Sequence, residues 1–332
     1  MIELIDTALL LIMVATALGF VFIRNLFAIV MLSGIFSLTA AVLYVVMDAV
    51  DVAFTEAAVG AGIATVLGLV ALSLTGRPDE APSKRSNIGP FLVTMLTGAV
   101  LINATFDMPN YGDPEAPAHQ HVAPRYIQQS GDEIGVPNIV TSVLASYRGY
   151  DTLGEVVVIF TAAVGVLALL GRRRRATAES RRGAGSAVEG MTGKSILRVT
   201  TKLLIPSIML FGLYVQFHGD YGPGGGFQAG VIFAAAIIVY ALLFGTHRAR
   251  RVISPGIVRF VLAFGVLLYA GVGVAGLLLG GNYLDYNVLA HDPVHGQHLG
   301  ILLIEFGVGA TVAAAMITIF LTFAGHDRPM EE

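Results

Sequence analysis

Hydrophobic and polar residues follow one another in long blocks along this chain. Nine blocks of 18 to 25 mostly apolar residues are separated by shorter polar segments. Because an α-helix rises ~1.5 Å per residue, a block of this length crosses the roughly 30 Å of hydrocarbon in a bilayer. We therefore predict an all-α polytopic membrane protein. The predicted spans are Leu4–Phe22, Leu26–Val46, Val52–Leu74, Ile88–Phe106, Leu153–Leu170, Ile196–Phe217, Phe227–Gly245, Ile257–Gly280 and Leu299–Phe323.

Composition supports a membrane protein and excludes an ordinary soluble enzyme. The 332 residues are 55% hydrophobic and 13% charged, whereas soluble domains carry roughly 25% charged residues. The chain has no cysteine, which excludes disulfides and thiolate-bound iron–sulfur clusters. No basic surface for nucleic acid is indicated, and membrane lipid is the expected surrounding.

The distribution of cations predicts an orientation. If the N-terminus is outside, alternating loops place 18 of the 20 lysines and arginines on the inner side, and only Arg125 and Arg148 lie outside. Cytoplasmic loops keep such an excess of basic residues. The pattern predicts an external N-terminus, a cytoplasmic C-terminus and a multi-pass protein of the bacterial cytoplasmic membrane.

Two polar breaks divide the chain. The basic, Gly/Ala/Ser-rich segment Gly171–Gly193 is typical of a flexible cytoplasmic linker. The second break, Phe106–Tyr150, is an expected external loop in which Ile139, Val140, Val143, Leu144 and Tyr147 recur at helical spacing, as in a short amphipathic helix. We predict a three-helix segment (1–80), a two-helix segment (86–171), a linker (172–193) and a four-helix domain (194–332).

Three glutamates fall inside predicted spans, where an ionisable group costs about 2.5–3.5 kcal/mol on insertion scales. Glu56 lies about one turn into the third span, and Glu305 about two turns into the last. Both are candidates for a proton or Na⁺ path. Glu155 is a weaker candidate, because Thr152 three residues earlier also fits a capping box.

The predicted orientation places each of these candidates in one half of the membrane. The three carboxylates fall in the outer half of the membrane, which suggests an external cation entrance whose oxygens suit the hard ion Na⁺. Lys202 falls in the inner half and is a further candidate for the ion pathway. Its long side chain could instead simply extend to the interface.

The segment between the sixth and seventh spans has an unusual sequence, HGDYGPGGGF. Its glycines suit a tight reversal of the chain, but a turn alone does not account for His218 and Asp220. Proton handling or subunit docking therefore remains open. The loop residues of interest are His218, Asp220, Pro223, Gly224, Gly225, Gly226 and Phe227.

Histidines in two other loops do not predict a metal site. His291, His295 and His298 have the spacing of metal ligands on a helix, but Pro293 disfavours a continuous helix across them. His119 and His121 provide only two ligands.

With these motifs the sequence resembles the multisubunit Mrp-type sodium/proton antiporters. The segment from Lys194 onward, with its HGDYGPGGGF turn, is similar to the B subunit. The stretch Asp51–Ala57 resembles the D-type segment of membrane-bound hydrogenases, and Tyr147–Glu155 resembles the E-type segment that follows it. In many Mrp systems these two segments end the A subunit, so their joining to a B-type domain is a departure from the usual arrangement.

The resemblance implies a transporter subunit without catalytic residues or a cofactor, with Na⁺ as the transported ion. It implies partners of the A, C, D, E, F and G types, and it strengthens Glu56 and Glu155 as ion-path residues. Two alternatives remain: a scaffold subunit that conducts nothing, and a subunit of a related hydrogenase-type ion pump.

Overall fold

The computed structural model describes residues 2–75, 88–110, 112–180 and 195–325. Within these residues, nine helices are long and apolar enough to cross a membrane, so the predicted all-α class with nine spans is confirmed. The orientation of the two ends stays a prediction. The elements of the N-terminal half are α1 (Ile2–Phe22), α2 (Leu26–Val46), α3 (Val50–Glu56), the π-helix η1 (Ala57–Ala64), α4 (Thr65–Thr75), α5 (Ile88–Thr105), α6 (Pro117–Gln120), α7 (Ala123–Glu133), α8 (Ile139–Thr141) and the π-helix η2 (Ser142–Tyr147).

The C-terminal half contains five long helices and two short ones. They are α9 (Gly149–Ser180), α10 (Ser195–His218), α11 (Gly226–Phe244), α12 (Thr246–Val252), α13 (Pro255–Leu278), the 3₁₀-helix η3 (Tyr286–Leu289) and α14 (Pro293–Phe323).

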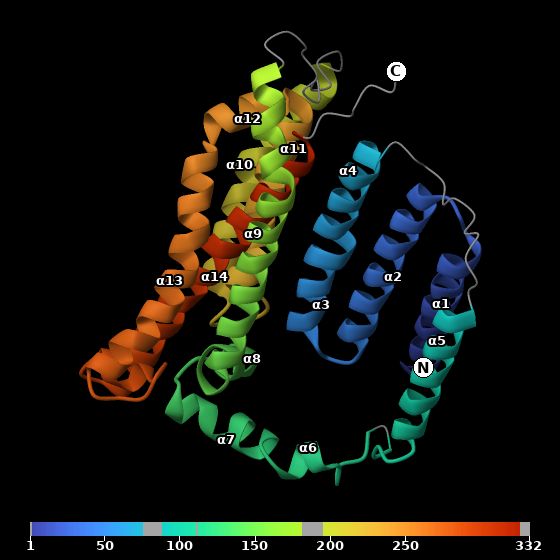
Figure 1. Ribbon diagram of the computed structural model, residues 1–332. Coiled ribbons are helices and arrows are strands. Elements are labelled where there is room, and N and C mark those ends of the chain that lie inside the picture. Colours follow the sequence, from blue (N-terminus) through green and yellow to red (C-terminus); the bar gives the residue numbers. More distant parts are fainter. Residues whose placement is uncertain (1, 76–87, 111, 181–194, 326–332) are drawn as a thin grey trace.

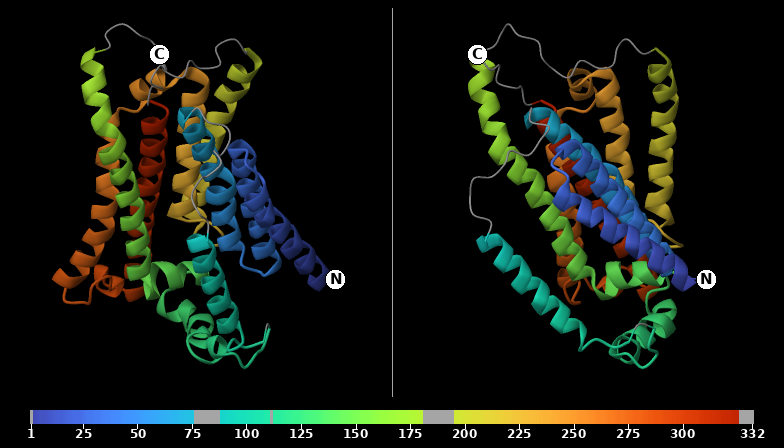
Figure 2. Two further views of the ribbon diagram at one scale, coloured as in Figure 1. Left: turned by 45° about the vertical axis from the view of Figure 1, so that its right-hand side comes forward. Right: turned by 90° about the vertical axis from the view of Figure 1, so that its right-hand side faces the viewer.

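Helices α1 to α4 form one layer that packs against the C-terminal bundle (Figures 1 and 2). The third span is a composite of α3, η1 and α4, because the hydrogen bonding changes to the π pattern directly after Glu56. The composite span lies against α11 and α14. The first three spans therefore do not form a separate body.

Helix α5 stands at the edge of the molecule and contains no buried residue. It is joined to α9 by the segment that carries α6, α7, α8 and η2, which runs along one end of the molecule (Figure 1). The predicted helical stretch 139–147 is present, but as α8 followed by a π-helix. Its buried residues are the small or polar Thr141, Ser142 and Ala145, whereas Val140 and Leu144 are exposed.

Helix α9 continues ten residues beyond Leu170, the predicted end of its span, since it ends at Ser180. Residues 181–193 of the predicted linker lie outside the described residues.

Helix α14 is the centre of the C-terminal bundle, with α9, α11 and α13 packed around it. Close approach depends on glycine: a side chain on Gly230 would meet the backbone of Gly309, and one on Gly307 would meet the backbone of Gly265. Small residues are the usual means by which helices approach closely in membranes. Pro293 begins α14, a position that suits proline. The prediction that no continuous helix runs across Pro293 is therefore confirmed, and His291 lies before the helix.

Candidate functional site

The glycine-rich turn brings the start of α11 onto a carboxylate of α14. The backbone N–H of Gly226 donates a hydrogen bond to Oε2 of Glu305. Gly225 has a φ of 108°, in the left-handed region that favours glycine, and its N–H donates to Val215 O at 3.0 Å. A side chain on Gly226 would clash with the backbone of Glu305 and Gly309. The glycines are thus required for contact with Glu305 as well as for the reversal of the chain.

Glu305 occupies a favourable position for a carboxylate inside a membrane. It lies within the span Pro293–Phe323 and is only partly buried in the isolated chain. The N-terminus of a helix presents free N–H groups and a partial positive charge, which stabilise an anion. The start of α11 therefore provides Glu305 with a partner that is neither a cation nor a metal.

The same turn carries an acidic residue that pairs with a histidine of α14. Asp220 lies 3.7 Å from Nδ1 of His298, and Nε2 of His298 lies 3.3 Å from Gly135 O. Burial raises the pKa of Asp220, and the nearby His298 opposes that shift. Asp220 also interacts electrostatically with Glu305. Two carboxylates and one imidazole therefore gather at this end of α11 and α14.

Asn138 connects this turn to two other parts of the chain. Its amide group donates to Gly219 O at 3.2 Å, to Gly222 O at 3.1 Å and to the Asp51 carboxylate at 3.2 Å. Its backbone N–H donates to Asp220 O at 3.0 Å. The segment between α5 and α9, the glycine-rich turn and the start of α3 consequently meet at one buried side chain.

Glu56 lies close to this region but faces a different helix. It ends α3 where η1 begins, and π-helical stretches are frequent at functional sites. The carboxylate lies over Gly60 beside Ser37 of α2, since a side chain on Gly60 would meet both. The preceding Thr55 accepts a hydrogen bond from Gln228 of α11 at 2.7 Å. Thr55 and Glu305 therefore contact the first turn of α11, whereas the Glu56 carboxylate faces α2.

The structure does not bring Glu155 and Lys202 into this cluster. The capping-box interpretation of Glu155 is wrong: α9 already begins at Gly149, and the Thr152 hydroxyl donates to Leu144 O at 2.8 Å. Glu155 is exposed on α9. Lys202 approaches the ring of Phe244, at the opposite end of α11, about 27 Å from Gly226 at ~1.5 Å per residue.

Several polar residues of the site were not found from the sequence. Tyr269 of α13 and Tyr286 of η3 are buried and interact electrostatically with Glu305. Their hydroxyls donate to Gly149 O at 2.7 Å and Ala145 O at 3.0 Å, respectively. A tyrosine in an apolar block has no special spacing, so the sequence gives no signal for either.

Gln228 and Asn138 do have a sequence signal in retrospect, because each is a polar residue next to an apolar block. Among the described residues, no group of three or more His, Cys, Asp or Glu residues is placed so that it could hold a metal ion. His295 pairs with Asp292 at 3.3 Å, which accounts for one histidine of the stretch 291–298.

Three protein families match successive parts of the chain. Residues 11–77 match MbhD, the D-type subunit of MBH, and residues 89–185 match MbhE, the E-type subunit of MBH. Residues 196–318 match the domain related to the MnhB subunit of the Na⁺/H⁺ antiporter.

Curated relatives agree with the third match. The putative antiporter subunits mnhB2 of Staphylococcus haemolyticus and Staphylococcus aureus are each 32% identical over 133 residues, which cover 39% of this chain and 94% of each relative.

Two solved structures resemble the whole or most of the chain. A chain of the Mrp complex from a Dietzia species aligns over 98% of this chain with a TM-score of 0.74 and 25% identity. This chain covers 35% of that longer chain. A chain of the archaeal membrane-bound sulfane sulfur reductase aligns over 71% of this chain and 97% of its own length, with a TM-score of 0.52 and 28% identity.

Proposed function

Because the chain belongs to the family of MnhB-type subunits of Na⁺/H⁺ antiporters, we propose that it forms part of the ion path of a multisubunit Mrp-type antiporter. The observation that carries this proposal is the contact between Glu305 and the start of α11. A carboxylate within a span is costly unless a partner or a function retains it. Here the partner is the helix terminus that the family motif creates.

In this proposal Glu305 binds Na⁺ and H⁺ alternately. The backbone N–H of Gly226 favours the charged carboxylate, which is the form that binds a hard cation through oxygen. Protonation neutralises the group and releases the cation. Asp220 and His298 provide an adjoining pair that can pass or hold a proton between Glu305 and the end of the molecule. Inward proton movement supplies the energy for exchange.

Glu56 and Glu155 are proposed as further ion-path positions, and Lys202 is not, because of its distance from the cluster. Glu56 lies beside Ser37 of α2, next to Thr55, which bonds to Gln228 of α11. Exposed Glu155 would complete a path only together with groups from another subunit.

The partners in this proposal are the other Mrp subunits, of the A, C, D, E, F and G types. Helix α5 has no buried residue, and only 6% of the best apolar window of α1 is buried. Such faces suit contact with neighbouring subunits and lipid. The chain would act as a transporter subunit of the bacterial cytoplasmic membrane, without a reaction or cofactor of its own.

The test replaces Glu305 with Gln in the assembled antiporter. We expect Na⁺-dependent proton exchange in everted vesicles to fall by about 10- to 100-fold, as expected for a loss of ~1.4–2.8 kcal/mol of barrier lowering. Glu115→Gln is the matched control, because Glu115 is exposed in the external loop. Copurification of the partner subunits is measured in parallel.

The parallel measurement separates the proposal from its alternatives. Lost exchange with an intact complex supports the ion path, whereas normal exchange in Glu305→Gln rejects it. Loss of the partner subunits would favour the non-conducting scaffold. A subunit of a related hydrogenase-type ion pump is the second candidate, favoured by the likeness to the archaeal reductase chain; copurifying iron–sulfur subunits would identify it.

A further inference from the structure

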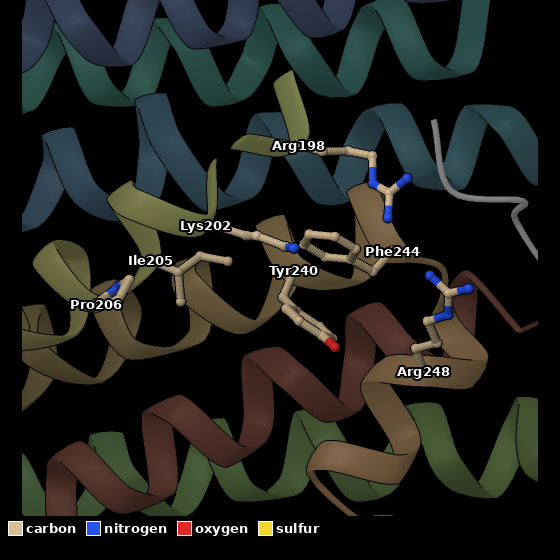
Figure 3. A pocket seen from close by; sticks show the side chains of 7 residues that line it. All are labelled: Arg198, Lys202, Ile205, Pro206, Tyr240, Phe244 and Arg248. Carbon is tan, nitrogen blue, oxygen red and sulfur yellow. The ribbon is translucent and has the colours of Figure 1, made fainter. Parts of the chain in front are cut away.

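A basic groove lies at the C-terminal end of α11, opposite the end where Gly226 contacts Glu305. Figure 3 shows the residues that line it. Arg198 and Lys202 of α10 and Arg248 of α12 line a cavity of about 370 Å³. Tyr240 and Phe244 of α11 form its aromatic wall. The groove lies where the candidate spans Ile196–His218 and Gly226–Phe244 approach the same end of the molecule, so it is at the level of a membrane interface.

The described part of the chain provides no acidic partner for the three cations. Among the described residues, no carboxylate lies within ion-pair distance of Arg198, Lys202 or Arg248. The guanidinium of Arg198 and the ammonium of Lys202 lie 5.6 Å and 6.0 Å from the centre of the Phe244 ring. Attraction to the ring stabilises both cations, but among the described residues no anion compensates their charge. An anion in the groove would neutralise that charge.

The rest of the lining shows what kind of anion fits. Ile205 and the two aromatic rings give the groove an apolar side next to its charged side. A small inorganic anion would use only the cations, whereas a phospholipid presents a phosphate together with apolar chains. Basic pockets between membrane helices are known to hold anionic headgroups. We propose that this groove binds the headgroup phosphate of an anionic phospholipid.

This assignment gives Lys202 a role independent of ion transport. Its side chain reaches the interface, as the sequence allowed, and there it acts with Arg198 and Arg248. The groove is separate from the Glu305 cluster, so the lipid site and the proposed ion path can fail or succeed independently.

The experiment measures lipid binding to the full chain purified in detergent with its copurifying partners. The probe is fluorescent phosphatidylglycerol, with fluorescent phosphatidylcholine as the neutral comparison. The triple variant Arg198→Gln, Lys202→Gln, Arg248→Gln is expected to bind phosphatidylglycerol at least about tenfold more weakly. The single variant Lys202→Gln should give an intermediate loss without a large change of surface charge.

The matched control removes three other exposed cations of the chain that do not line the groove: Arg24→Gln, Arg251→Gln and Arg259→Gln. It should bind like the unaltered protein. Equal binding by the groove variant and the unaltered protein would overturn the proposal, as would an equal loss in the control. Displacement of phosphatidylglycerol by millimolar inorganic phosphate would identify a free phosphate site and overturn the lipid assignment.

Discussion

At the scale of single residues, the glycine-rich motif could be recognised from the sequence, but the contact that it makes with Glu305 could not. The glycines of HGDYGPGGGF were expected to reverse the chain, and Gly225 does adopt a positive φ. What could not be predicted is that Glu305, almost eighty residues later, receives the N–H of Gly226. Contacts between distant residues depend on which helices pack together, and one sequence does not contain that information.

Gly226 gives a direct test of this close contact. A methyl group there would clash with the backbone of Glu305 and Gly309, so Gly226→Ala should lower the free energy of unfolding by about 1–3 kcal/mol, as overpacking does. Thermal unfolding of the purified chain in detergent measures the loss. Gly271→Ala is the control, because a side chain there meets nothing within 4 Å. Equal unfolding temperatures for both variants would contradict the clash.

At the scale of elements, apolar blocks predict membrane helices well but not their internal hydrogen bonding. The third span was expected as one helix, yet the π-helix η1 occupies its middle, directly after Glu56. The stretch 139–147 likewise changes to π geometry, with its small and polar residues Thr141, Ser142 and Ala145 buried and the larger Ile139, Val140 and Leu144 exposed. Amphipathic spacing reveals a helix but not which face the rest of the protein will cover.

The segment between α5 and α9 also provides a pH test. Arg125 lies 3.0 Å from Glu133, and the Tyr147 hydroxyl donates to the same carboxylate. These interactions lower the pKa of Glu133, the bond from Tyr147 contributing most. A lowered pKa means that the contact stabilises the folded segment above the unfolded pKa of Glu133 and is lost as pH falls through the folded pKa.

We therefore expect α7 to loosen when the pH falls below about 4.5, the ordinary pKa of a glutamate. A spin label on Gln128→Cys, an exposed position of α7, should become more mobile in acid. In the Glu133→Gln background the label should show the same mobility throughout the titration. A pH response that survives Glu133→Gln would assign the change to another group.

At the scale of the whole molecule, the number and approximate limits of the spans followed from hydrophobicity, because the bilayer thickness fixes the helix length. Their arrangement did not. The central position of α14 arises from glycines that permit close contact with α11 and α13, while α5, equally apolar, has no buried residue. Hydrophobicity alone cannot distinguish a helix that faces lipid or another subunit from one that forms the core.

The orientation predicted from the cations remains to be tested, and the absence of native cysteine makes the test direct. Single cysteines at Ala118 of α6 and Val252 of α12 occupy exposed positions at opposite ends of the molecule (Figure 1). Since basic residues stay cytoplasmic, a membrane-impermeant maleimide should label Ala118→Cys in intact cells and Val252→Cys only after permeabilisation. The reverse pattern would invert the orientation and place the basic groove outside, where the anionic lipids of the cytoplasmic leaflet could not reach it.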